Sequence, residues 1–263
     1  MPLSNCKIVL TGGSGGIGRR VSSLLLERGA SLTTISRSAD DPLPGTRHFH
    51  ADLSSASGLQ AAASLVEDEE PDILINLAGV QNFGPFEEQS PSDVRDTYSI
   101  NLIAPVLLSR AALPAMKRKK AGQIVNVGSI LGSIGFAYFS AYSSSKAGLR
   151  IFSEALRREL NGTGVLVTYI APRATRTGLI TSRLQQYADL TGMAIDDPDR
   201  VAGQIVRSIE SGKTDVYFGT AERFFVKLNG FMPRLVDSFL AGNDRKASQI
   251  FLQKPHSTEG IKS

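Results

Sequence analysis

Seven short runs rich in aliphatic and β-branched residues alternate with longer helical segments along most of the chain. Most of these runs are apolar almost throughout, which is typical of strands in a parallel sheet that helices cover on both faces. Right-handed crossovers between such strands give a doubly wound α/β fold. The expected strands are residues 6–11, 31–36, 47–52, 72–78, 123–129, 165–171 and 215–219.

The length and composition fit a single large domain. The 263 residues can bury a sizeable core, and 41% apolar with 21% charged residues is typical of a globular protein. No repeat or linker divides the sequence, so we predict one domain over residues 1–242, with a long loop at 178–200 and an apolar helical extension at 222–242. Residues 243–263 are more polar, and we predict a partly mobile tail there.

Other features restrict the compartment and the partners. The single cysteine, Cys6, excludes an internal disulfide framework. The N-terminus shows no secretory signal and we find no apolar run long enough to span a bilayer, so we expect a cytoplasmic protein. The net charge is a modest +4, and the one dense basic run, Lys117–Lys120, has no interleaved aromatic residues and suits a helix C-terminus. We therefore predict no nucleic-acid partner, and we predict no metal site.

A glycine-rich turn follows the first expected strand and opens the first expected helix. It contains both G-x-G-x-x-G, ending at Gly18, and T-G-x-x-x-G-x-G, beginning at Thr11. Glycines let the backbone turn sharply and leave room for a pyrophosphate at the helix N-terminus, where free N–H groups favour anions. The position of this turn therefore predicts a dinucleotide site. Its expected cofactor contacts are Gly12, Ser14, Gly16, Ile17 and Gly18.

Two other kinds of site fit this turn poorly. A phosphate-binding P-loop needs Lys-Ser/Thr after its last glycine, whereas this chain has Arg19–Arg20. Residues 12–16 also match G-x-S-x-G, the nucleophile elbow of serine hydrolases, which requires an acid and then a histidine later in the chain. None of the three histidines suits that role, because two alternate along an expected strand and one lies in the polar tail. They are His48, His50 and His256.

The residue after the second expected strand bears on the choice of dinucleotide. An acidic residue there would bind the ribose hydroxyls of NAD. The strand here ends in Ser36 and Arg37, and no carboxylate appears before Asp40. Because an arginine can bind a 2′-phosphate, we predict NADP(H) rather than NAD(H).

A tyrosine and a lysine four residues apart, Tyr142 and Lys146, share one face of an expected helix. Ser129 ends an expected strand thirteen residues earlier. In an open parallel sheet the ligand crevice lies at the carboxyl ends of the strands, which is where this serine and that helix would meet. The three side chains are therefore candidates for one site.

Taken together, these motifs resemble the short-chain dehydrogenase/reductase family, the single-domain Rossmann type. The resemblance spans residues 11–177 and rests on motifs that are specific as a set. They are "TGGSGGIG", "ADL" at 51–53, "NLAG" at 76–79, Asn101, Ser129 and "YSSSK" at 142–146. The family implies an NAD(P)-dependent oxidoreductase acting on a carbonyl or an alcohol, assembled as a homodimer or homotetramer.

The resemblance also implies roles for matched residues. The catalytic roles fall on Asn101, Ser129, Tyr142 and Lys146, with Tyr142 and Lys146 also at the cofactor. Asp52 and Leu53 would hold the adenine. The residues that would line the rest of the cofactor are Asn76, Ala78, Gly79, Pro172, Thr175 and Thr177.

Elementary electrostatics agrees with the catalytic assignment. A tyrosine of pKa about 10 can donate a proton, and shifting that pKa by roughly 3 units towards neutrality takes about 4 kcal/mol. A cation about 4–5 Å away contributes on the order of 3–4 kcal/mol at an effective dielectric near 20. We therefore expect Lys146, with an oxidised nicotinamide, to lower the pKa of Tyr142. Ser129 would orient the substrate oxygen, and Asn101 would hold a water-linked proton path to the lysine.

The segment after the sixth strand departs from the family pattern. Pro-Gly-x-Val-x-Thr reads here as residues 172–177, with Pro172 and Thr177 kept and Arg173 in place of glycine. We weigh two roles for this arginine, contact with a substrate anion and, in preference, exposure to solvent.

Two apolar segments bear on the substrate, the family's variable substrate loop at 178–200 and the extension at 222–242. The extension fits core cover or an oligomer contact, a lid on an apolar substrate, or contact with a membrane surface. We expect a lipophilic ketone or an acyl-type substrate, and an NADP(H)-dependent carbonyl reductase. The alternatives are a non-catalytic NADP(H)-binding regulatory or scaffold protein, and an epimerase or dehydratase that uses the same cofactor.

Overall fold

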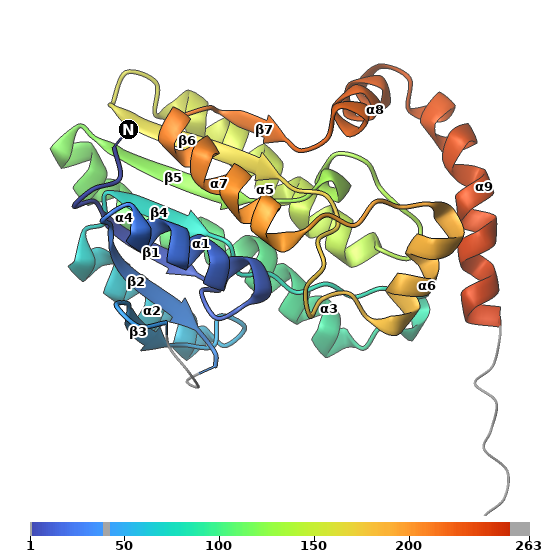
Figure 1. Ribbon diagram of the computed structural model, residues 1–263, viewed down its shortest axis with the longest axis horizontal. Helices are drawn as coiled ribbons and strands as arrows, with labels where there is room; N and C mark the ends of the chain where they lie inside the picture. The colour runs from blue at the N-terminus through green and yellow to red at the C-terminus, as the bar shows by residue number, and fades with distance from the viewer. Residues whose placement is uncertain (1, 39–42, 253–263) are drawn as a thin grey trace, which may run out of the picture.

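The computed structural model describes residues 2–38 and 43–252, which form a seven-stranded sheet with helices on both faces (Figure 1). Every strand pairs in parallel, in the order β3-β2-β1-β4-β5-β6-β7. All seven expected strands are present. Their bounds are β1 Lys7–Thr11, β2 Ser31–Ser36, β3 Arg47–His50, β4 Ile73–Asn76, β5 Gly122–Val127, β6 Val165–Ala171 and β7 Asp215–Tyr217. The doubly wound fold is confirmed.

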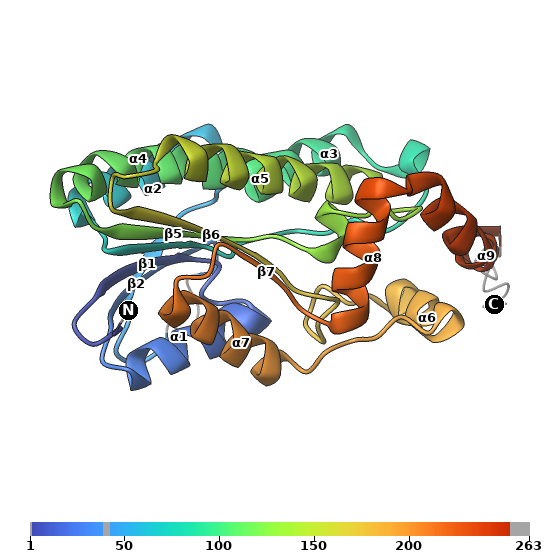
Figure 2. The ribbon, with the colours of Figure 1, turned by 90° about the horizontal axis from the view of Figure 1, so that it is seen from above.

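The helices form two layers around the sheet (Figure 2). One layer holds α2, α4 and α5, and the other holds α1 and α7. The longer helices are α1 Gly16–Glu27, α2 Ala56–Glu69, α3 Pro91–Tyr98, α4 Ala104–Lys119, α5 Ser140–Glu159, α6 Ser182–Thr191, α7 Pro198–Ser211, α8 Thr220–Phe231 and α9 Pro233–Leu252. Short turns of helix are η1 Phe86–Glu88, the π-helix η2 Ser99–Ile103 and η3 Ile130–Gly132.

The sheet places successive strand residues in different cores. Val9 and Leu74 pack with α2 and α4, whereas Ile8, Ile73 and Val125 pack with α1 and α7. This alternation follows from the period of two along a strand, and it explains why the central strands are apolar on both faces. The sheet order reverses between β1 and β4, so the carboxyl ends of these two strands flank the crevice where ligands bind in such folds.

The basic run Lys117–Lys120 ends α4, as expected. Its first three residues lie in the last turn and Lys120 is the left-handed C-cap. Arg118 pairs with Glu70, which joins the end of α4 to the end of α2. The run is therefore an anchored helix terminus.

The C-terminal boundary differs from the prediction. Helix α9 passes through residue 242 without a break and continues to Leu252, with Ala247 and Ile250 buried. Residues 243–252 are thus helical and belong to the domain. The remainder of the predicted tail, 253–263, lies outside the described residues.

One helical stretch also corrects the expectation about apolar length. The continuous helix Pro91–Lys119 contains an 18-residue window of mean hydropathy 1.4, which by length and composition could cross a membrane. Half of that window is buried inside the protein, where α4 packs against α2 and the sheet. A helix at the core of a globular fold has these same properties.

Candidate active site

A cavity of about 430 Å³ runs along the carboxyl ends of the strands. It extends from the glycine-rich turn to α5 and the loop after β6. The predicted cofactor residues that line it are Gly12, Ser14, Gly16, Ile17, Gly18, Arg37, Asp52, Leu53, Ala78, Gly79, Tyr142, Lys146, Pro172, Thr175 and Thr177. The fold therefore brings together residues that are up to 165 positions apart in the chain, Gly12 and Thr177 being the outermost.

The glycine-rich turn is closely packed at two positions. Gly12 has φ +78°, and a Cβ there would lie 2.8 Å from the Ala78 Cα. A Cβ on Gly18 would lie 2.0 Å from the Gly12 carbonyl oxygen, so neither position accepts a side chain. The Thr11 hydroxyl accepts hydrogen bonds of 3.1 Å from the Leu77 and Ala78 amides, which fixes the turn against the end of β4. The start of α1 is thereby held at the cavity, as a pyrophosphate site requires.

The far end of the cavity carries one cation and one carboxylate. The Asp52 carboxylate accepts from the Ser54 amide (3.0 Å) and hydroxyl (2.8 Å). These bonds lower the pKa of Asp52, and the charge of Arg37 contributes in the same direction. Arg37 itself is exposed at the rim of the cavity, just beyond β2. An exposed guanidinium at this point is available for an anionic group of a ligand.

Asn76 lies elsewhere than predicted. It is buried beneath the cavity and is absent from its lining. Its amide nitrogen donates to the Asn126 Oδ1 (2.8 Å), and Asn126 in turn donates to the Ser153 hydroxyl (2.9 Å). This chain of bonds joins β4, β5 and α5 inside the core. We conclude that the Asn76 side chain supports the floor of the site.

Ser129, Tyr142 and Lys146 meet at the cavity as expected. The Ser129 side chain is close enough to the Tyr142 hydroxyl to affect its pKa, and all three residues are buried. The Lys146 Nζ lies 6.0 Å from the centre of the Tyr142 ring and donates to the Val127 carbonyl (3.1 Å). A serine hydroxyl, a phenol and an amine thus line one end of the cavity.

Tyr169 fixes the backbone of that serine. Its hydroxyl, from the centre of β6, donates to the Ser129 carbonyl (3.2 Å). The preceding residue is Gly128, where a Cβ would lie 2.2 Å from the Tyr169 hydroxyl. The close packing leaves Ser129 with little freedom at the end of β5. The sequence had not singled out Tyr169, because it reads simply as an apolar strand residue.

The pKa values of the phenol and the amine are set mainly by burial. Burial raises the pKa of Tyr142, and the Ser129 side chain partly opposes this. Burial lowers the pKa of Lys146 from 10.5 to about 8. The expected lowering of the tyrosine pKa is therefore not found in the protein alone, because the effect of burial outweighs that of Ser129. A positive ligand charge in the cavity would have to supply the remainder.

Asn101 is close to these residues but does not face the cavity. It lies in η2, fully buried, and donates to the Val80 carbonyl (2.9 Å) and the Ser145 hydroxyl (3.1 Å). Its side-chain oxygen accepts from the Val80 amide (3.0 Å). Both amide hydrogens are used, so the side chain braces the loop after β4 against α5. The role of Asn101 in a water-linked proton path to Lys146 stays a prediction.

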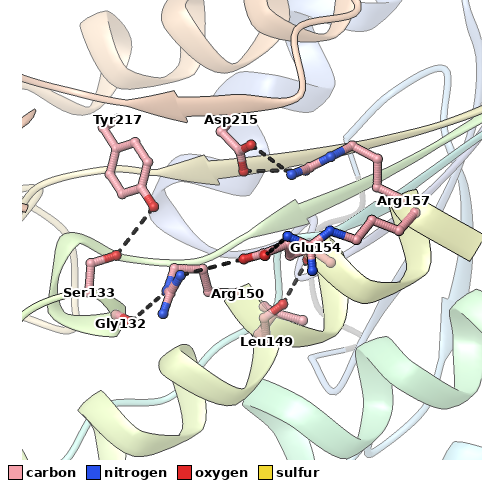
Figure 3. A network of polar contacts seen from close by, with 10 residues as sticks. Gly132, Ser133, Leu149, Arg150, Glu154, Arg157, Asp215 and Tyr217 are labelled. Carbon is pink, nitrogen blue, oxygen red and sulfur yellow. Dashed lines mark hydrogen bonds and ion pairs between the residues drawn. The ribbon is translucent and has the colours of Figure 1, made fainter. Parts of the chain in front are cut away.

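Ionic contacts hold the active helix α5 to the edge of the sheet (Figure 3). Arg157 pairs with Asp215 of β7 (2.9 Å), and Arg150 donates to the Gly132 carbonyl in η3 (3.3 Å). Glu154 lies between the two arginines on the same helix and is 3.9 Å from Arg150. These contacts join α5 to β7 and to η3, the short helix that follows Ser129.

Arg173 is neither solvent-facing nor free to bind a substrate anion. It forms two bonds with Asp196, one of 2.9 Å through Nε, and a third bond of 3.0 Å with Glu222 of α8. These carboxylates, Asp196 first, raise the pKa of the guanidinium above its ordinary value. Asp196 also bonds through its backbone to Ala174 and Arg176. The arginine that replaces the family's glycine therefore ties the loop after β6 to the residues before α7 and to α8.

An apolar wall closes the side of the cavity next to Tyr142. Aromatic rings pack around Phe83, with Phe139 at 4.7 Å, Tyr187 at 5.2 Å and Phe251 at 5.2 Å between ring centres. Leu184, from the predicted substrate loop, joins the same cluster and lines the cavity. Sequence analysis missed Phe83, Phe139 and Phe251, which come from three separate loops and helices with no shared spacing. Among residues 2–38 and 43–252, no group of His, Cys, Asp or Glu side chains is placed to hold a metal ion.

Comparison with known proteins agrees with this geometry. Residues 7–188 match the family model described as short chain dehydrogenase. The ketoacyl reductase HetN of Nostoc sp. is 32% identical, over 81% of this chain and 78% of the relative. The 3-ketodihydrosphingosine reductase of Mus musculus is 31% identical, over 84% and 73%. A short chain dehydrogenase from Burkholderia cenocepacia J2315, solved in complex with NADP, superimposes with a TM-score of 0.78 at 24% identity, over 91% of this chain and 99% of that one.

We predict that Arg173→Ala lowers the free energy of unfolding by about 2 kcal/mol, because it leaves two half-buried carboxylates unpaired. Urea unfolding followed by circular dichroism measures the change. The matched control is Arg28→Ala, which removes the more exposed ion pair with Glu210 (2.7 Å) and should cost at most about 1 kcal/mol. Equal losses for the two variants would contradict the special role of Arg173.

We predict that Lys146→Met, which removes the buried amine, raises the free energy of unfolding at neutral pH. At pH 7 the lysine is charged in both states and the folded state carries the full cost of burial, about 3 kcal/mol for the shift from 10.5 to about 8. Losing the bond to Val127 offsets about 1 kcal/mol, which leaves a gain of about 2 kcal/mol.

The gain should shrink as the pH rises above the folded pKa of about 8, because the folded lysine then becomes neutral before the unfolded one. Urea unfolding at neutral and at alkaline pH tests this. Lys213→Met, at an exposed lysine, is the control, and it should change the free energy of unfolding little at either pH. A gain that grows with pH would show that burial is not the cause.

Proposed function

The chain belongs to the short-chain dehydrogenase family, and on this premise we propose that it is an NADP(H)-dependent oxidoreductase that interconverts a ketone or aldehyde and an alcohol. The observation that carries the proposal is the buried set of Ser129, Tyr142 and Lys146 at one end of the cavity. A protein that only bound a nucleotide would need the glycine-rich turn but not a phenol, a hydroxyl and an amine held together at the other end.

The proposed chemistry assigns one task to each side chain. The nicotinamide cofactor, when bound, supplies the hydride for reduction or accepts it for oxidation. The Tyr142 hydroxyl gives its proton to the carbonyl oxygen as the alcohol forms, and takes a proton in the reverse direction. The Ser129 hydroxyl donates a hydrogen bond to the same oxygen and fixes its position. The charge of Lys146 stabilises the phenolate that remains after proton donation.

The residues at the other end of the cavity support the choice of NADP(H). Gly12 and Gly18 keep the turn free of side chains where a pyrophosphate would approach. Arg37 presents an exposed guanidinium where a 2′-phosphate would lie, and no carboxylate follows β2 within the described residues 37–38. A charge-assisted pair between the two would favour NADP(H) over NAD(H).

The apolar wall supports a lipophilic substrate. Phe139, Leu184 and Met193 line the cavity beside Tyr142, so a ketone bound there would extend along hydrocarbon side chains. The two curated relatives described above are named for reduction of ketoacyl and 3-ketodihydrosphingosine compounds. We infer that the substrate is a ketone or alcohol on an aliphatic or acyl chain.

Assembly and location follow the same premise. Ile103, Leu107 and Ile151 are exposed apolar residues on η2, α4 and α5. They would be covered if two copies packed through these helices, so we propose a homo-oligomer built on that face. We propose a cytoplasmic location, which suits a chain with one cysteine and a bound NADP(H).

We predict that Tyr142→Phe lowers kcat by roughly 10²–10⁴-fold, since it removes only the hydroxyl that exchanges the proton. The assay is oxidation of NADPH with a soluble dicarbonyl, and NADPH fluorescence shows whether the variant still binds cofactor. Tyr98→Phe is the control, because it removes a hydroxyl that bonds Ser144 (2.6 Å) outside the cavity. Cofactor binding with near-normal turnover in Tyr142→Phe would refute the assignment.

We also predict that Arg37→Ala raises the KM for NADPH by roughly 10-fold or more, the value of a charge-assisted hydrogen bond, and leaves the KM for NADH nearly unchanged. Steady-state kinetics with both cofactors measures the split. Arg47→Ala, which removes the ion pair of β3 with Glu69, is the control. Equal changes for the two cofactors would show that Arg37 does not contact the 2′-phosphate.

A further inference from the structure

Helix α8 contributes no buried residue, although it contains three phenylalanines. It follows the short edge strand β7 and leads into α9, which forms one extreme end of the molecule in both views (Figures 1 and 2). The phenylalanines of this helix are exposed, so its aromatic side is available for another surface.

The side of α8 that faces the body is defined by three contacts. Glu222 pairs with Arg173 (3.0 Å), Val226 packs against the cluster around Tyr169, and the Asn229 side chain donates to the Ser133 carbonyl (3.0 Å). Spacings of four and three residues place these side chains on one side of the helix. α8 therefore attaches to the protein largely through its polar side.

The opposite side of α8 is aromatic and exposed. Phe224 and Phe231, seven residues apart, lie on that side and are 62% and 87% exposed. The exposed apolar surface continues through Met232 into α9, where Leu235 and Phe239 share a side four residues apart. We call these five residues the outer face.

Its exposure excludes two of the roles considered for this segment. The outer face does not cover the core, because its side chains are exposed, and none of them lines the cavity, so it is not a lid on the substrate. A second copy of the chain and a lipid surface remain. The exposed apolar residues of η2, α4 and α5 already offer a separate face for a second copy.

The charges beside the outer face favour the lipid surface. Arg223, Lys227 and Arg234 are exposed cations next to its aromatic residues, and Asp237 is the exposed acid among residues 223–239. Large apolar side chains mixed with basic residues suit the boundary between headgroups and acyl chains, and the cations suit anionic headgroups. We infer that the outer face docks on the surface of a bilayer that contains anionic phospholipids.

The position of the outer face suggests what docking is for, and this part of the inference alone rests on the proposed function. Helix α9 begins at the outer face, and its last turn carries Phe251, which belongs to the aromatic cluster of the apolar wall. Docking would therefore attach to the bilayer, where a lipophilic ketone dissolves, a helix that also contributes to that wall. The docking itself requires only the outer face and its cations.

Flotation of the full chain with vesicles tests the inference. Phosphatidylcholine vesicles with phosphatidylglycerol should carry the protein upward at low salt, and phosphatidylcholine alone should carry far less. The double variant Lys227→Gln/Arg234→Gln should weaken binding about 25-fold, at about fivefold for each basic residue. Phe231→Ser/Phe239→Ser should weaken it at least ~10-fold, since two aromatic groups no longer enter the interface. Ile151→Ser, which changes an exposed apolar residue on α5 away from the outer face, is the control and should bind as the unaltered chain does.

Three results would overturn the inference. The first is that the protein does not float with the vesicles at low salt, and the second is that both double variants float as well as the unaltered chain. The third is that Phe231→Ser/Phe239→Ser lowers the molar mass measured by light scattering, which would assign the outer face to a second copy. Turnover of a soluble dicarbonyl with NADPH should be the same in all these variants, because none of the changed residues lines the cavity. A chain that floats but does not turn over would refute the proposed function and leave the docking intact.

Discussion

The burial of Lys146 beneath the ends of the strands is the interaction on which the rest of the site depends. A lysine normally keeps its charge in water, yet here the amine is enclosed and bonded to a backbone carbonyl of β5. That placement costs stability, and the surrounding elements compensate for it. The amide chain through Asn76 and Asn126 holds β4, β5 and α5 in register, and Asn101 fixes the loop above them. The precision of the site is therefore built by polar groups that never face the cavity.

A second set of contacts is particular to this chain. Where its family has a glycine after the sixth strand, Arg173 joins the loop that carries Thr175 to Asp196 and to α8. The loop thus depends on the C-terminal helices for its position, which a glycine would not require. Asp196 and Glu222 give the charge of Arg173 partners beside the cavity.

Much of the fold was predictable from the sequence, because apolar strands and the glycine-rich turn are local signals. The seven strands agree with the apolar runs to within one or two residues at most ends, and Tyr142 and Lys146 share a helix face by spacing alone. What the sequence did not reveal depends on contacts between distant segments. Asn76 and Asn101 fit family motifs, but their amide groups are turned into the core by partners that the motifs do not reveal. The end of α9 looked polar because its buried residues, such as Ala247 and Ile250, are separated by charged and polar ones.

Helix α9 lies outside the family motifs, yet it contributes to the surroundings of the cavity. At 20 residues and about 30 Å it is a rigid rod, anchored at its far end by Phe251 against Phe83 and Tyr138. A version of the chain shortened before residue 247 would keep every family motif and the whole sheet, yet would remove Phe251 from the aromatic cluster beside the cavity. The last turns of the chain therefore support the apolar wall from a part of the sequence that the motifs do not reach.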